Sequence, residues 1–189
     1  MQSEPHPDAA GPTFRPWPQP LEGGWPAGYR VVVRRRALPA PDPGAAFLHL
    51  AEAILGWDLH RGSGLRVRAD GPRAVPGAEV AVGVGLGPVR WYAPCRVLWS
   101  TEPVLDAAGQ PVGGQRAGFG YEALPGHPES GQEGFYAELT EAGQVSFAVA
   151  AYSRPATRVL RLGRPAVEAV QELITRRYFA SAARLAGGN

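Results

Sequence analysis

A loop rich in proline and glycine, residues 124–133, carries the densest group of ionisable side chains in this chain. Tyr121, Glu122, His127, Glu129 and Glu133 lie in or beside it. A histidine exchanges protons near neutral pH, and a neighbouring carboxylate can orient it, which suits acid/base chemistry such as hydrolysis or cyclisation. One candidate catalytic site therefore consists of His127, Glu129 and Tyr121.

The same loop has two other interpretations. His127, Glu129 and Glu133 offer one nitrogen and two oxygens to a metal ion, but the prolines and glycines prevent the helix that normally aligns such ligands. The loop could instead be a rigid connection between two strands, with His127 held by hydrogen bonds. We prefer this structural interpretation, and we expect neither a bound metal nor another cofactor.

Aromatic side chains at alternate positions of predicted strands form a second candidate site. Trp91 and Trp99 share strand parity with Cys95, which we interpret as a small buried hydrophobe. Phe119 likewise shares parity with Tyr121, so each strand places its rings on one face. Rings with a polar tip suit a pocket for a hydrophobic ligand, although core packing would explain each ring as well. The predicted ligand-binding residues are Trp57, Trp91, Trp99, Phe119, Tyr121 and Tyr152.

Composition excludes several classes of enzyme. All 19 basic residues are arginine, which rules out a Schiff-base lysine, a lysine-linked pyridoxal cofactor and the lysine of a P-loop. The single cysteine rules out an internal disulfide, a Cys-rich zinc site and a dithiol redox pair. Arg34, Arg35 and Arg36 would point alternately to opposite sides of a strand, and the net charge is only +2, so we expect no nucleic-acid partner.

Hydropathy gives no sign of a membrane protein. No stretch approaches the roughly 18 apolar residues of a membrane span, and the first residues show neither the basic start nor the apolar run of a secretory signal. We therefore expect a cytoplasmic protein without a transmembrane segment, and the sequence leaves its oligomeric state open.

The positioning elements divide the 189 residues into an arm, 1–28, and one domain, 29–189. Seven of the 20 prolines lie in the first 26 residues, interleaved with Phe14, Trp17 and Trp25, so the arm either packs its rings on the domain or forms a disordered leader. A strand is expected from residue 29, and Asp42-Pro43 predicts the start of a short helix that Gly56 ends in a left-handed conformation.

Beyond residue 64 the hydrophobic period changes to two. It predicts six strands, at 65–69, 79–87, 89–101, 116–123, 133–140 and 144–152. A helical period returns after Pro155 and predicts a long helix from about residue 165 to 186. These are the parts of a helix-grip fold, an α+β architecture in which a curved antiparallel sheet of six to seven strands wraps a long C-terminal helix and encloses a cavity.

Four segments carry a resemblance to a known family. AFLHLAEAILGWDLH, APCRVLW, GFGYEALPGHPESGQEGF and FAVAAYSRP occur in this order, and together resemble the signature segments of the family named domain of unknown function nineteen-ninety. The match extends from Tyr29 to about Leu185. The family has no settled activity, and in architecture it is similar to START-like lipid-transfer and polyketide-cyclase proteins, so the resemblance implies the fold more than a reaction.

Two functions follow from these features. The preferred one is a non-catalytic protein that binds a small hydrophobic or aromatic metabolite between the sheet and the C-terminal helix. The alternative is a cyclase- or hydrolase-like enzyme that uses the His127 loop for acid/base chemistry. Binding is preferred because the chain has aromatic strand faces but no nucleophile and base at a recognised spacing.

Overall fold

One curved antiparallel sheet dominates the structure, a computed structural model that describes residues 11–86, 89–156 and 164–187. Within these residues the sheet has seven strands in the order β1-β7-β6-β5-β4-β3-β2, so β2 to β7 form a meander and β1 pairs with the last strand. The strands are β1 (Arg30–Ala37), β2 (Arg66–Ala69), β3 (Glu79–Leu86), β4 (Val89–Thr101), β5 (Gln115–Ala123), β6 (Glu129–Leu139) and β7 (Val145–Pro155).

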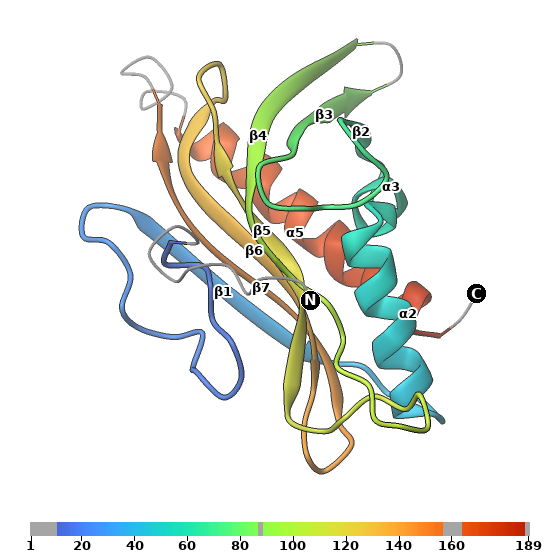
Figure 1. Cartoon of the computed structure of the whole chain (residues 1–189). Coiled ribbons are helices and arrows are strands. Elements are labelled where there is room, and N and C mark those ends of the chain that lie inside the picture. The colour runs from blue at the N-terminus through green and yellow to red at the C-terminus, as the bar shows by residue number, and fades with distance from the viewer. Residues whose placement is uncertain (1–10, 87–88, 157–163, 188–189) are drawn as a thin grey trace.

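Three helices lie on one side of this sheet, and Figure 1 shows the strands curving around them. They are α2 (Pro43–Leu55), α3 (Asp58–Gly62) and α5 (Arg164–Ala186). The expected helix-grip fold is confirmed. The predicted strands are present with shifted ends, and β6 begins at Glu129, four residues earlier than the periodicity indicated.

The start of α2 follows the predicted capping, but its end differs. The Asp42 side chain accepts a hydrogen bond of 3.0 Å from the Ala45 amide, and Pro43 occupies the first turn. At the other end, Gly56 has φ −85°, and the left-handed residue is Trp57, with φ 71°. Gly56 therefore ends α2 as expected, but the expectation that it adopts a left-handed conformation was wrong. Trp57 adopts this conformation with its side chain fully buried, and α3 follows directly.

The two halves of α5 have different neighbours. In the C-terminal half, Tyr178, Phe179 and Ala182 are buried, with the Phe179 ring 4.9 Å from the ring of Phe147. In the N-terminal half, Val170 and Leu173 are 46% and 48% exposed. The core is thus made by the concave face of the sheet, by α2 and α3, and by the second half of α5. The first half of α5 does not pack into this core.

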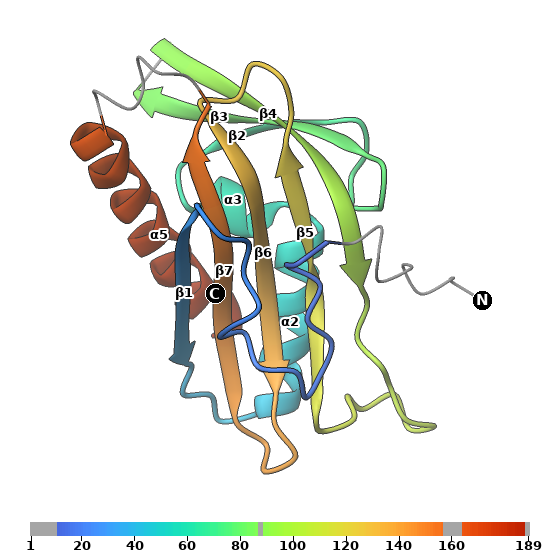
Figure 2. The same cartoon turned by 90° about the vertical axis from the view of Figure 1, so that its left-hand side faces the viewer.

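The described part of the N-terminal arm, residues 11–28, packs against the convex face of the sheet, as Figure 2 shows. The Trp99 indole donates a hydrogen bond of 3.0 Å to the hydroxyl of Thr13, and the Tyr136 hydroxyl donates to the Thr13 carbonyl. Phe14 meets Trp99 edge-on, with ring centroids 5.7 Å apart. The aromatic residues of the arm therefore bury a second, smaller hydrophobic cluster.

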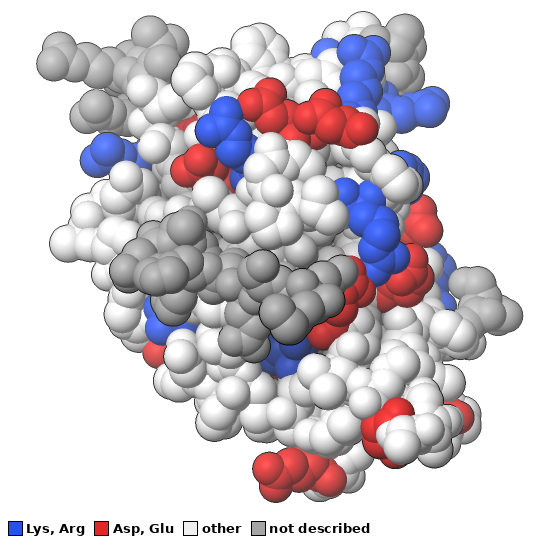
Figure 3. Space-filling model, in the orientation of Figure 1, with Lys and Arg blue, Asp and Glu red and all other residues white. Residues whose placement is uncertain are grey.

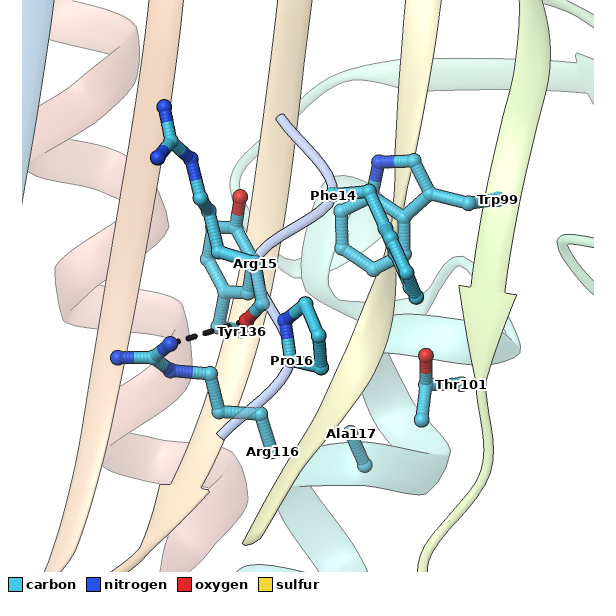
Figure 4. A pocket seen from close by; sticks show the side chains of 8 residues that line it. All are labelled: Phe14, Arg15, Pro16, Trp99, Thr101, Arg116, Ala117 and Tyr136. Atoms are coloured by element: carbon cyan, nitrogen blue, oxygen red, sulfur yellow. Dashed lines mark hydrogen bonds between the residues drawn. The ribbon is translucent and has the colours of Figure 1, made fainter. Parts of the chain in front are cut away.

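A buried ion network lies under the same arm. Glu138 accepts hydrogen bonds of 2.7 Å from Arg116 and from Arg35, and it is only 2% exposed. Arg116 also donates to the backbone carbonyls of Arg15 and Gln19 in the arm. Figure 4 shows this contact beside Phe14 and Trp99. The hollow there measures only about 10 Å³, about the smallest volume that holds one water molecule, so it is too small for a ligand.

Candidate functional site

A cavity of about 900 Å³ lies between the concave face of the sheet and the first half of α5. Six of the strands, from β1 to β7 with the exception of β2, contribute side chains, and the turn between β5 and β6 closes one end. The surface of the wall is largely apolar, with aliphatic side chains such as Val32, Val82 and Val84 on the sheet and Ile174 on α5. Trp91 lines the cavity and is 64% exposed, so the cavity communicates with solvent beside this ring.

The polar centre of this wall is the pair Glu133 and Tyr121, on neighbouring strands. The two residues face each other in the register of β5 and β6, and the Tyr121 hydroxyl donates a hydrogen bond of 2.9 Å to Oε2 of Glu133. Tyr178 of α5 hydrogen-bonds Tyr121 in turn. Sheet and helix are thus joined by a chain of three polar groups inside the cavity.

Burial dominates the electrostatics of this chain of polar groups. It raises the pKa of Glu133 to about 7, with a smaller opposing effect of the Tyr121 hydrogen bond. The pKa values of Tyr121 and Tyr178 are raised well above their ordinary value, first by burial and then by the charge of Glu133. A carboxyl group with a pKa near neutrality in an apolar cavity is able to hold or release a proton at physiological pH.

A second polar cluster lies where the first half of α5 approaches the start of β6. Arg30 donates a hydrogen bond of 2.6 Å to Gln171, and Gln171 donates to the carboxylate of Glu129. Burial raises the pKa of Glu129, and a hydrogen bond from Ser153 opposes that change. This cluster ties β1 and β6 to the helix along one border of the cavity.

His127 lines the cavity in the turn before Glu129, but it does not pair with the Glu129 carboxylate. Its Nδ1 lies 3.0 Å from the backbone nitrogen and 2.9 Å from the backbone oxygen of Glu129. Burial lowers the pKa of His127, with an opposing effect of the Glu129 backbone. All three residues of the candidate catalytic site therefore line the cavity, but their side chains bind other partners: Tyr121 binds Glu133, the Glu129 carboxylate binds Gln171, and His127 binds the Glu129 backbone.

The structure brings only two of the six predicted ligand-binding residues to the cavity, Trp91 and Tyr121. Trp57 and Phe119 are fully buried in the main core, with ring centroids 5.0 Å apart, and support the wall from behind. Trp99 and Tyr152 lie on the convex face, where Trp99 packs on Phe14 and Tyr152 on Trp25. These contacts place Trp57, Phe119, Trp99 and Tyr152 outside the cavity lining, which corrects the prediction that they contact the ligand.

A β-bulge explains the position of Trp99. Val97 pairs with Tyr121, yet Trp99 pairs with Gly120, so β4 has one more residue than β5 between these pairs. Side chains alternate between the two faces of a strand, and one extra residue reverses the alternation. Trp91 and Cys95 therefore face the cavity, whereas Trp99, which has the same parity, faces the arm.

Sequence reasoning missed Tyr178 and considered Glu133 only as a possible metal ligand. The signal for Tyr178 was its spacing of four from Ile174, which places both on one face of α5, and both line the cavity. It also overlooked His60, which is enclosed by aromatic rings, including Tyr178 at 5.2 Å. Burial lowers the pKa of His60 to about 3, so this ring is a neutral part of the core wall behind the cavity.

Cys95 lines the cavity and is 1% exposed. Burial and the nearby Glu133 raise the pKa of its thiol, which keeps it protonated and unreactive at neutral pH. In the described parts of the chain, no three His, Cys, Asp or Glu side chains are grouped as a metal site would require. No helix formed by the described residues has the length and hydrophobicity to cross a membrane. On the face shown in Figure 3, acidic and basic side chains are interspersed.

Solved structures with the same architecture are distant in sequence. TTHA0849 from Thermus thermophilus is 13% identical, with a TM-score of 0.52 over 83% of this chain and 97% of that one. The Zhui aromatase/cyclase from Streptomyces sp. R1128 is 17% identical, with a TM-score of 0.52 over 84% of this chain and 93% of that one. At these identities the likeness concerns the fold alone.

Sequence comparison gives a closer relationship. A UPF0548 protein from Deinococcus radiodurans is 38% identical over 87 residues, which are 46% of this chain and 42% of that protein, so the match spans less than half of the relative's length. The model of the family described as Domain of unknown function (DUF1990) matches residues 16–181, beginning inside the arm. Because this match extends over most of the sequence, the chain belongs to the DUF1990 family.

Proposed function

We propose that this protein binds a small hydrophobic or aromatic metabolite in the cavity between the sheet and α5. The observation that carries the proposal is the cavity itself, with a volume of about 900 Å³ and a largely aliphatic and aromatic wall. Pockets that hold small molecules in proteins measure roughly 300–1,000 Å³ and combine an apolar wall with a few placed polar groups. The pair Glu133 and Tyr121 supplies such groups.

The residues proposed to contact the ligand are Trp91, Tyr121, Glu133 and Tyr178. Trp91 is exposed, whereas Tyr121 and Tyr178 are buried and Glu133 is partly buried in the cavity wall. A ligand that extends from Trp91 to these three residues would place an apolar body against Val82 and the other aliphatic wall residues. Its polar group would meet the hydroxyls and carboxyl at the inner end, which would set its orientation.

A ligand screen by thermal unfolding tests the proposal. We expect members of a library of lipids, sterols and aromatic metabolites to raise the melting temperature, because a ligand that binds only the folded state stabilises it. At a concentration of about 100 times its Kd, such a ligand adds about 2.7 kcal/mol, which corresponds to roughly 5–10 °C for a chain of this size. Sugars and other highly polar compounds serve as controls. A broad library without a single stabilising member would contradict the proposal.

An acid/base enzyme is the second candidate function. The observation that favours it is a carboxyl group with a pKa of about 7, hydrogen-bonded to Tyr121 and facing the cavity. This arrangement moves the proposed proton-transferring group from His127 to Glu133. Turnover of a bound compound that disappears in a Glu133→Gln variant, while the compound still raises the melting temperature, would favour the enzyme over the binding protein.

A further inference from the structure

Glu133 is a partly buried carboxyl group of the cavity wall that has no cationic partner among the described residues. Tyr121 donates a hydrogen bond to Oε2, whereas Oε1 has no hydrogen-bond partner within the described parts of the chain. Glu138, on the same strand, is matched by both Arg35 and Arg116. A partly buried carboxylate without a counter-ion is less stable than one that is paired. A ligand that carries a positive charge would therefore gain more at Glu133 than a neutral ligand.

The other charged side chains of the cavity wall already have partners. Arg30 and Glu129 both hydrogen-bond Gln171 and so lie together at one border. Glu172 forms an ion pair of 3.3 Å with Arg34. Among the described residues, Glu133 is thus the charged group of the cavity wall that lacks a counter-ion. An anionic ligand would be repelled by it, and a neutral one would not offset it.

Aromatic rings next to this carboxyl would also favour a cation. Tyr121 binds Glu133 directly, and Tyr178 binds Tyr121, so both rings stand beside the position that a ligand group at Oε1 would take. Burial raises the pKa of both phenols, which keeps them neutral at physiological pH. The face of a neutral aromatic ring attracts ammonium groups within about 6 Å.

We propose that the ligand of this cavity is a hydrophobic or aromatic amine whose protonated nitrogen donates a hydrogen bond to Oε1 of Glu133. This inference rests on the proposed function, because it names the chemical class of the metabolite that the cavity would bind. The apolar wall takes the body of the amine, and the carboxylate of Glu133 supplies the counter-ion.

The proposal predicts a defined pH dependence. The pKa of Glu133 is about 7, so the ionised fraction of this carboxyl rises from about one tenth at pH 6 to about nine tenths at pH 8. An aliphatic amine stays protonated across this range. Its affinity should therefore rise about tenfold from pH 6 to pH 8. The titratable groups that face Glu133 from the surrounding elements are Cys95, Tyr121, His127, Glu129, Tyr178 and, behind the rings, His60.

Most of these neighbours keep one charge state in that range. The pKa values of Cys95, Tyr121 and Tyr178 are raised, and that of His60 is lowered to about 3, so all four stay neutral. The pKa of Glu129 is raised and that of His127 is lowered. Both are retained when Glu133 is replaced, so the difference between the two proteins isolates the effect of Glu133.

A matched pair of fluorescent probes, pyrenylmethylamine and pyrenylmethanol, tests the inference by titration of the full chain. At pH 8 we expect the amine to bind at least about tenfold more tightly than the alcohol, as expected for a hydrogen bond between charged groups. Glu133→Gln should remove this preference and the pH dependence, while alcohol binding stays within about threefold of the original. Glu122→Gln, which changes the net charge equally but replaces a carboxylate outside the cavity wall, is the matched control and should bind both probes as the original protein does.

Each outcome decides the matter. Equal affinity for the two probes in the original protein would overturn the amine inference and leave the proposed binding function standing. Failure of the amine to bind would also overturn it, and the ligand screen would then judge the binding function separately. An amine preference that persists in Glu133→Gln would show that another group recognises the nitrogen. Melting curves establish first that the variant is folded. If the variant is not folded, the comparison of the two probes and the pH dependence in the original protein still test the amine inference.

Discussion

A chain that ends after Gly163 is expected to lose cooperative folding altogether. The truncation removes α5, whose second half places Tyr178, Phe179 and Ala182 in the main core. The Tyr178 ring lies 5.0 Å from that of Phe135, and the Phe179 ring 4.9 Å from that of Phe147. Each large apolar side chain contributes about 1.5–3 kcal/mol when buried, and the total stability of a domain is only about 5–15 kcal/mol. The loss of the helix should therefore exceed what the remaining contacts can offset.

Circular dichroism during thermal or urea unfolding measures this effect. A chain that ends after Gly187 is the control, because it keeps all of α5, and its melting temperature should equal that of the full chain. A chain without α5 that unfolds in one cooperative transition would show that the sheet, α2 and α3 form a stable unit without it.

Replacement of Glu138 by alanine is expected to lower the free energy of unfolding by about 3–5 kcal/mol, the usual loss when one partner of a buried ion pair is removed. Glu138 is 2% exposed and accepts hydrogen bonds from two guanidinium groups, those of Arg35 and Arg116. Arg116 is itself 7% exposed, so the variant would leave a buried positive charge without its counter-ion. The melting temperature should fall by roughly 10 °C.

Glu22→Ala provides a matched control, because Glu22 is the other carboxylate near Arg35. It lies 3.8 Å from this arginine, and its side chain is 62% exposed. An exposed ion pair contributes at most about 1 kcal/mol, so this variant should melt close to the original protein. If the two variants proved equally stable, the network under the arm would not have the stabilising role that its burial indicates.

The order of the strands could be predicted from local patterns in the sequence. Alternating hydrophobic residues from 65 to 152, interrupted by turn residues, predicted consecutive antiparallel strands, and the register confirms this order from β2 to β7. Asp42 and Pro43 likewise specify the start of α2 through contacts within one turn. These features were predictable because each depends on residues close together in the chain.

Features that depend on distant contacts could not be predicted in this way. The bulge in β4 moves Trp99 to the convex face, and alternation alone cannot reveal where an extra residue is inserted. Trp57 adopts a left-handed conformation because burial of its ring in the core outweighs a local preference for glycine. The packing of the arm depends on Thr13, which reaches Trp99 and Tyr136 from more than 80 positions away.

Only some residues of the candidate site could be predicted from the sequence. Tyr121 and Trp91 were named because they follow the strand period, and both line the cavity. Glu133 and Tyr178 join Tyr121 only when two strands and the C-terminal helix are assembled, so no sequence spacing indicates their contact. The elevated pKa of Glu133 arises from that enclosure, which a sequence does not display.

The measurement that tests the central claim most directly is a calorimetric titration of the most stabilising ligand into a protein whose cavity has been filled. In the double variant Ala93→Trp and Ala151→Trp, two small residues of the cavity wall are replaced by large ones on β4 and β7. We predict one binding site per chain in the original protein, at least about tenfold weaker binding in the double variant, and unchanged binding in Ala142→Trp, where the exposed turn before β7 is altered. A folded double variant that bound the ligand as tightly as the original protein would contradict the assignment of this cavity as the binding site.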